Sequence, residues 1–312
     1  SVASSRVGNS SRKLYGNRTL PANRNFPLTP VTSLLIGASM WGVIWYPMRL
    51  LETQGLSGIW LTLILFAVAL VVSLPYTYKA FAEFVTSPGH AALLMLAAGW
   101  TNIAFVEAVL GGNILRVLLL FYLSPLWAVI LGWLILRERP SRVAIVSLLV
   151  AMIGALIMLW DGRMGFPWPS SLPDWYALSS GFAFALSNVI TRKAQHLSLS
   201  AKVLSVWGGV VVLGVAIILS SHIAMPAISL QTFLAAAVLG VVGILFMTTL
   251  VQHGVTHMPV HRSAVISLIE LVAGAVSQQL LTDEIVTVRE WVGGALIVIG
   301  AYLSARATHR FE

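Results

Sequence analysis

Residues 113–140, which read NILRVLLLFYLSPLWAVILGWLILRERP, decide the fold of this protein. Between Ile114 and Leu136 the single charged side chain is that of Arg116, and a helix needs about 20 mostly apolar residues to cross a bilayer. Windows of this kind recur along the chain and predict ten membrane-spanning helices. They cover residues 31–50, 58–76, 90–109, 113–135, 142–160, 174–192, 202–220, 231–252, 261–282 and 290–307. Because barrel strands are half as long and alternate in polarity, we expect an all-α integral membrane protein.

The composition excludes most soluble protein classes. Of the 312 residues, 58% are hydrophobic and 10% are charged, whereas a soluble domain carries about 25% charged residues. So few charges cannot cover the surface of a water-soluble protein of this size, which argues against a cytosolic enzyme and against a nucleic-acid-binding protein. The chain has no cysteine, so disulfides, thiolate metal sites and cysteine nucleophiles are excluded.

The distribution of basic residues predicts the orientation. If the N-terminus is cytoplasmic and ten helices alternate, only four of the 19 Lys and Arg residues fall outside, namely Arg49, Arg116, Arg163 and Arg289. The positive-inside rule favours this arrangement. We therefore expect both termini in the cytoplasm and the protein in the bacterial inner membrane. Residues 1–29 are basic and free of acid, and we interpret them as a disordered cytoplasmic tail; an organelle transit peptide is the alternative.

Spacings along the chain indicate an internal duplication. Arg116 precedes Glu138 by 22 residues, and Arg262 precedes Glu284 by the same interval. A shift of 146 residues superimposes these pairs and places Ser124 on Glu270. Each half then has five spans, and because five is odd the second half enters the membrane inverted. Such inverted repeats place a transporter's substrate site near the midplane, between the halves. The predicted divisions are a tail (1–29), a first repeat (30–160), a periplasmic linker (161–173), a second repeat (174–307) and a cytoplasmic tail (308–312).

The stretch from Arg116 through Pro140 to Gly154-Ala155 resembles the EamA repeat of the drug/metabolite transporter superfamily, as found in YddG-like exporters. A second copy runs from Arg262 through Glu270 to Gly300-Ala301 and resembles it too. The resemblance implies ten helices in two inverted repeats and the export of a small metabolite, without indicating which one. In the second copy Glu270 is followed by Leu271, where the family pattern has an acid followed by proline, so a proline hinge is not expected there.

Glu270 is the most informative single residue. It lies about nine residues into the predicted span 261–282, roughly 13 Å deep at 1.5 Å per residue. A carboxylate at that depth costs several kcal/mol unless it is paired, protonated or facing water. We interpret Glu270 as a substrate-binding and proton-coupling candidate, with a structural acid bonded to a neighbouring helix as the alternative. Pro125 cannot donate to the carbonyl of Phe121 and predicts a kink, which is either a hinge or static.

Aromatic and polar side chains near the middle of the spans complete the predicted pocket, with lipid-facing or core packing as the alternative for each. These substrate-binding candidates are Trp41, Trp45, Trp100, Thr101, Phe121, Tyr122, Ser124, Phe184, Asn188 and Glu270. Glu107, Arg116 and Arg262 are candidates for a structural ion pair or a gate. The histidines at 253, 257 and 261 are spaced by four, but Pro259 interrupts a shared helix, so we expect no metal site and no cofactor.

The sequence therefore predicts a secondary transporter, not an enzyme. We expect it to export a small amphipathic or amino-acid-like metabolite by alternating access around an aromatic site that contains Glu270. A lipid or headgroup translocator of the same fold is one alternative. An intramembrane metal-dependent enzyme is another, which the missing ligand cluster disfavours. The expected partners are a small solute and the bilayer, with no nucleic acid, and the sequence leaves a homodimer open.

Overall fold

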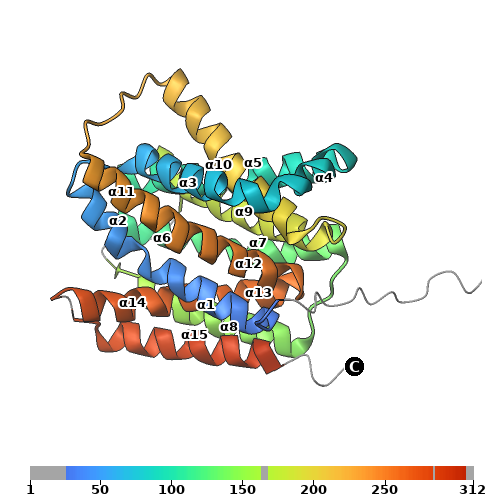
Figure 1. Ribbon diagram of the computed structural model, residues 1–312. Helices are drawn as coiled ribbons and strands as arrows, with labels where there is room; N and C mark the ends of the chain where they lie inside the picture. The colour runs from blue at the N-terminus through green and yellow to red at the C-terminus, as the bar shows by residue number, and fades with distance from the viewer. Residues whose placement is uncertain (1–25, 163–167, 284, 307–312) are drawn as a thin grey trace, which may run out of the picture.

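The computed structural model describes residues 26–162, 168–283 and 285–306, which are helical with short connections (Figure 1). Most of the two predicted tails, part of the predicted linker, and Glu284 therefore lie outside the described residues. The helices are α1 (Pro30–Val43), α2 (Trp45–Glu52), α3 (Gly58–Thr77), α4 (Phe81–Thr86), α5 (Pro88–Gly111), α6 (Ile114–Phe121), α7 (Ser124–Leu131), α8 (Arg142–Leu159), α9 (Leu172–Lys193), α10 (Leu199–Ser220), α11 (Leu230–Leu239), α12 (Phe246–Thr256), α13 (Val260–Ser267), α14 (Ile269–Leu281) and α15 (Val288–Arg306). A 3₁₀ turn (Tyr78–Ala80) joins α3 to α4, and π-helical turns follow α7 (Gly132–Leu136) and α11 (Gly240–Leu245).

Nine helical segments of the described chain are long and apolar enough to cross a bilayer. They are Pro30–Glu52, Gly58–Thr86, Pro88–Gly111, Ile114–Leu136, Arg142–Leu159, Leu199–Ser220, Leu230–Thr256, Val260–Leu281 and Val288–Arg306. The remaining predicted span, α9, has 22 residues but is more polar. It packs against α5, α6, α7 and α12, and its polar residues Ser180, Ser187 and Asn188 are buried. These polar residues face neighbouring helices, which explains the lower hydropathy of α9. Ten spans therefore remain our proposed count.

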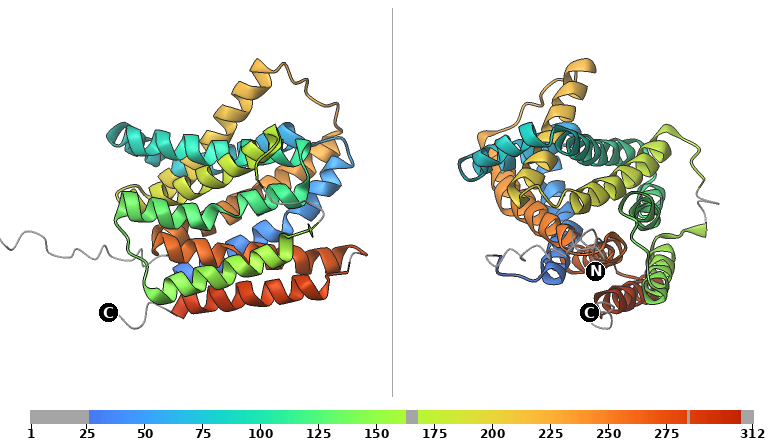
Figure 2. Two further views of the ribbon diagram at one scale, coloured as in Figure 1. Left: turned by 180° about the vertical axis from the view of Figure 1, so that it is seen from behind. Right: turned by 90° about the vertical axis from the view of Figure 1, so that its right-hand side faces the viewer.

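The packing of the helices repeats when the two halves are exchanged. The first helix, α1, packs against α12 and α14, and its counterpart α9 packs against α5 and α7. The pairs α3–α10 and α8–α15 join equivalent helices of the two halves, and α8 and α15 lie together at one edge of the bundle (Figures 1 and 2). The start of α1 and the end of α15 lie at the same end of the bundle (Figure 1). This exchange symmetry is the pattern that the inverted repeat predicts.

Glycines allow the closest helix contacts. A Cβ atom on Gly209 of α10 would lie 2.0 Å from the carbonyl oxygen of Met95 in α5. A Cβ atom on Gly154 of α8 would lie 2.5 Å from the carbonyl oxygen of Gly293 in α15. Small residues let helix backbones approach closely in membranes, where van der Waals packing drives association. These contacts fix the positions of helices in different halves relative to one another.

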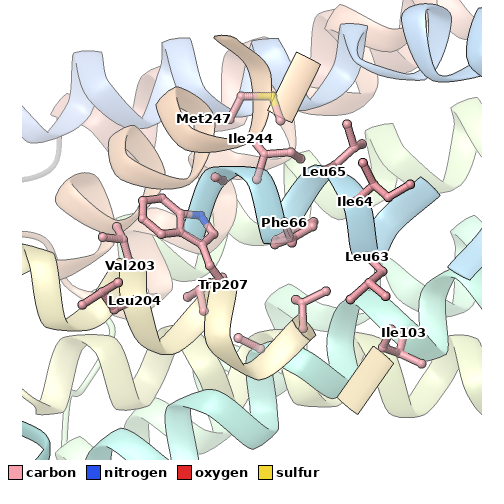
Figure 3. Packing of buried hydrophobic residues seen from close by; sticks show 14 of the residues in the cluster. Leu63, Ile64, Leu65, Phe66, Ile103, Val203, Leu204, Trp207, Ile244 and Met247 are labelled. Atoms are coloured by element: carbon pink, nitrogen blue, oxygen red, sulfur yellow. The ribbon is translucent and has the colours of Figure 1, made fainter. Parts of the chain in front are cut away.

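The largest hydrophobic cluster joins the two halves on one side of the bundle. Trp207 of α10 is 1% exposed and belongs to the same cluster as Phe66 of α3 and Met247 of α12 (Figure 3). Ile244, in the π-helical turn before α12, belongs to it too. A second cluster joins α8 and α15 to the spans that contain Phe121 and Leu268. Both clusters therefore contain residues from the two halves and pack helices of one half against helices of the other.

Two equivalent spans are interrupted at equivalent points. The first break, at residues 122–123, separates α6 from α7, and Pro125 explains it because it cannot donate to the carbonyl of Phe121. The second break, at Leu268, separates α13 from α14, and the 146-residue shift places Tyr122 on Leu268. No proline follows Leu268 within α14. The second half therefore interrupts its span at the single residue Leu268 without a proline.

Candidate functional site

The two helix breaks line one small cavity between the halves. Its volume is about 10 Å³, room for roughly one water molecule. The first half contributes α6, α7 and the break between them, and the second half contributes α9, α13 and α14. The lining residues are Phe121, Tyr122, Ser124, Pro125, Ala128, Phe184, Ala185, Asn188, Ala264, Ser267, Leu268 and Glu270. In this conformation the cavity is closed to a solute larger than water.

Glu270 is the only Asp, Glu, His, Lys or Arg among the described residues that line the cavity. It lies in the first turn of α14, directly after the break at Leu268. The hydroxyl of Tyr122 donates a hydrogen bond to its carboxylate. One carboxyl group and its phenol partner thus connect the two broken spans.

Two further polar side chains face the cavity without a partner. Ser124 and Asn188 are each 3% exposed and line the cavity. Within the described chain, no hydrogen bond to the Ser124 hydroxyl or to the Asn188 amide is formed. Neither side chain is among the fully buried polar groups that lack a partner in the described chain, so their polar atoms keep access to the cavity and are free to bind a group that enters it.

An aromatic wall forms one side of the site. The ring of Phe121 lies 5.2 Å from that of Tyr122 and 5.6 Å from that of Phe184, measured between centroids. Phe105 of α5 supports Phe121 from behind at 4.8 Å. The sequence does not single out Phe105, because a phenylalanine in an apolar span carries no local signal of its position.

Four predicted pocket residues lie away from this cavity. The indole of Trp45 donates to the Ser277 hydroxyl at 2.9 Å and thereby links α2 to α14. The indole of Trp100 donates to Ser179 at 3.2 Å. Trp41 packs against the cluster around Trp207, and the Thr101 hydroxyl bonds the carbonyl of Ala97 within its own helix. The structure therefore separates these residues from the six that do line the cavity.

One end of the cavity region is tied by Arg116. Its guanidinium bonds the carboxylate of Asp174 at 3.0 Å and the Ser170 hydroxyl at 3.1 Å, joining α6 to the start of α9. Glu107, the predicted partner of Arg116, forms no ion pair with a described residue. Asp174 was missed although the sequence carries a signal for it, since Ser171 and Asp174 form a capping box at the start of α9.

The opposite end is tied by Glu138. Its carboxylate accepts from Arg192 at 3.4 Å and from the backbone N–H of Val260 at 2.9 Å. Arg192 also donates to the carbonyl of Thr256 at 2.9 Å. Glu138 thus connects the end of the fourth predicted span to α9 and to the start of α13.

Two other sequence candidates take structural positions. Arg262 donates to the carbonyl of Ala305, which links α13 to α15. The ring of His253 stacks on Phe26 at 3.9 Å. No group of three or more His, Asp or Glu side chains that could hold a metal ion occurs in the part of the chain that the structure describes.

Comparison with known proteins identifies the repeat. Residues 28–160 and residues 171–306 each match the EamA-like transporter family. Both matches together cover most of the chain, and each contains one of the two broken spans. The duplication seen in the spacing of charged residues is therefore a duplication of this family's domain.

The chain is also similar to individual proteins, at low sequence identity and over part of their length. The chain is 28% identical to Protein RarD of Salmonella typhimurium over 55% of its own length and 58% of that protein. It is 25% identical to the "Probable amino-acid metabolite efflux pump" of Escherichia coli over 57% of its length and 62% of that protein. Each alignment thus spans less than two thirds of the relative. A protein of known crystal structure superimposes with a TM-score of 0.71 at 17% identity, covering 88% of this chain and 96% of the other, which shows a shared fold.

Proposed function

The chain belongs to the EamA-like transporter family. We propose that it is a secondary membrane transporter that exports a small amphipathic, amino-acid-like solute by alternating access. The main support is the cavity at which the two broken spans meet, because it combines Glu270 with an aromatic wall. Inverted-repeat transporters hold their substrates between the repeats, at discontinuous helices.

The polar ties at both ends support an occluded state. Arg116 with Asp174 closes one end, and Glu138 with Arg192 closes the other. Access from either side requires one of these ties to separate while the other holds. Because the halves are inverted copies, rocking one against the other creates two open states of similar energy.

Glu270 is the proposed coupling residue. When the cavity is empty, the protonated form of the Glu270 carboxyl has the lower free energy, because an isolated charge within the bilayer is costly. A bound cation permits the ionised form, so the solute and a proton compete for one group. Tyr122, which lines the same cavity from the other broken span, is a titratable side chain bonded to Glu270.

Solute counterflow tests this proposal. Purified protein in proteoliposomes preloaded with an unlabelled amine or amino acid should accumulate the labelled form above protein-free vesicles. A lipid translocator, the alternative within the same fold, would instead expose a fluorescent lipid of the inner leaflet to dithionite without moving solute. Lipid movement in the absence of counterflow of any tested solute would refute solute export.

Cysteine labelling tests the orientation. Ser57 and Ser171 are exposed N-caps of α3 and α9, and Gly89 is an exposed residue of α5 at which an added Cβ atom would meet no neighbour within 4 Å. In the cysteine-free background, Ser57→Cys and Ser171→Cys should react with an impermeant maleimide in intact cells. Gly89→Cys should react only after lysis. The reverse pattern would place the termini outside.

A further inference from the structure

The chemistry of the cavity points beyond transport to a class of solute, and this inference rests on the proposed function. We infer that the site selects monocationic solutes: an apolar or aromatic amine that carries a neutral polar group, such as an amide or a hydroxyl. A zwitterionic amino acid with a free carboxylate fits less well. The inference stands on the single carboxylate of the described lining, on the unpartnered Asn188 and Ser124, and on three arginines of the lining helices that are bound to other groups.

Charge balance is the first step. Glu270 contributes the only ionisable carboxylate of the described lining, and the described lining contains no Lys or Arg. A monocation bound to ionised Glu270 leaves the cavity neutral. A zwitterion leaves it with one uncompensated negative charge, or else must bind a protonated Glu270 and forfeit the ion pair. In a medium of low dielectric, the neutral complex is favoured.

Three arginines on the helices that line the cavity are engaged elsewhere. Arg116 bonds Asp174, Arg192 bonds Glu138, and Arg262 bonds the carbonyl of Ala305. Each of these contacts also ties one end of a broken span or its neighbour to another helix. Recruiting one of them for a substrate carboxylate would break a contact that joins helices, so the site offers a carboxylate no free counter-ion.

The unpartnered polar groups suit a neutral function. An asparagine amide presents two N–H donors and one carbonyl acceptor, and a serine hydroxyl both donates and accepts. A substrate amide or hydroxyl can satisfy donors and acceptors together. A carboxylate accepts only, so it would leave the carbonyl oxygen of Asn188 without a donor. Asn188 and Ser124 therefore match a polar group that is uncharged.

The aromatic wall completes the fit. The rings of Phe121, Tyr122 and Phe184 line the same cavity as Glu270. Aromatic faces attract ammonium groups and also pack against an apolar body. An aromatic amine thus finds its charge, its ring and its neutral polar group each matched by a different part of the lining.

Three probes with one side chain separate the chemistries: phenethylamine (a cation without a further polar group), phenylalaninamide (a cation with a neutral amide) and phenylalanine (a zwitterion). Each probe is tested in proteoliposomes for how strongly it inhibits the counterflow of a labelled solute. We expect phenylalaninamide to compete at least tenfold better than phenylalanine. Asn188→Ala should weaken competition by the amide at least fivefold and leave phenethylamine within twofold.

Ser187→Ala is the matched control, because Ser187 is the buried neighbour of Asn188 on α9 and does not line the cavity. It should leave all three probes unchanged. Asn188→Ser, which retains a smaller polar group, serves if Asn188→Ala does not fold. Equal or better competition by phenylalanine, an equal effect of Asn188→Ala on every probe, or competition by none of the three would overturn the inference. In each of those outcomes counterflow of another solute would leave the proposed function standing, whereas no counterflow of any solute would contradict that function itself.

Discussion

Glu270→Gln should reduce counterflow of a cationic solute about 100-fold while the protein still inserts and purifies as wild type. The substitution keeps the shape of the side chain and removes its charge. Loss of one partner from a buried, hydrogen-bonded charge pair costs about 2–5 kcal/mol, and about 1.4 kcal/mol corresponds to a tenfold change in affinity. The same variant should no longer respond to an imposed pH gradient, because it lacks the carboxyl group that we propose exchanges a proton for the solute.

Two further variants make the result specific. Glu52→Gln makes the same chemical change at an exposed carboxylate at the end of α2 and should transport as wild type. Tyr122→Phe removes only the hydroxyl that bonds Glu270 and should reduce transport about tenfold, since a hydrogen bond to a charged group contributes about 1.5–3 kcal/mol. If Glu270→Gln transports the solute at the wild-type rate at every pH, Glu270 is a buried structural acid without a role in transport.

Gly209→Ala should destabilise the protein by about 3 kcal/mol, because overpacked cores lose roughly 1–3 kcal/mol and the obstacle here is backbone. The added Cβ atom would lie 2.0 Å from the carbonyl oxygen of Met95, so α5 and α10 must separate. Gly99 faces the same contact from α5, where a Cβ atom would lie 2.5 Å from the carbonyl oxygen of Gly209. The measurement is the thermal midpoint in detergent, with a fall of at least about 5 °C expected.

The adjacent glycine provides the control. A Cβ atom on Gly208 would meet only the flexible end of Met95, at 3.4 Å. Gly208→Ala should therefore be neutral or slightly stabilising, since alanine is favoured over glycine inside a helix by up to about 1 kcal/mol. Equal midpoints for the two alanine variants would show that the α5–α10 contact tolerates separation, contrary to this packing.

The two halves carry different side chains at one pair of equivalent positions in the cavity. Ser124 and Glu270 occupy equivalent positions, directly after equivalent breaks, and both line the cavity. One half thus supplies a neutral hydroxyl and the other a carboxylate. Under the proposed function, the repeated fold would provide the symmetry that alternating access needs, and the unequal pair Ser124 and Glu270 would bind the two ends of an asymmetric solute differently.

Some features could be predicted from the sequence because they are local or periodic. Membrane spans follow from runs of apolar residues, and the duplication follows from equal spacings between Arg116 and Glu138 and between Arg262 and Glu284. Pro125 marked its break because its missing N–H acts on a residue only four positions away. Glu270 stood out because a carboxylate inside an apolar run is costly wherever it points.

Other features depend on helix rotation and tilt. Arg116 meets Asp174 across 58 residues, and Trp45 meets Ser277 across 232. The indoles of Trp45 and Trp100 turn away from the cavity, whereas Asn188 turns into it and finds no partner. The rotation of each helix is set by contacts such as Gly209 against Met95, where a single methyl group decides how closely two backbones approach. The sequence by itself determined the spans, the repeat and the acid, since each is written in neighbouring residues or in a fixed interval. Only the tertiary structure decided which side chains share the cavity, because that depends on how distant glycines and breaks orient the helices against one another.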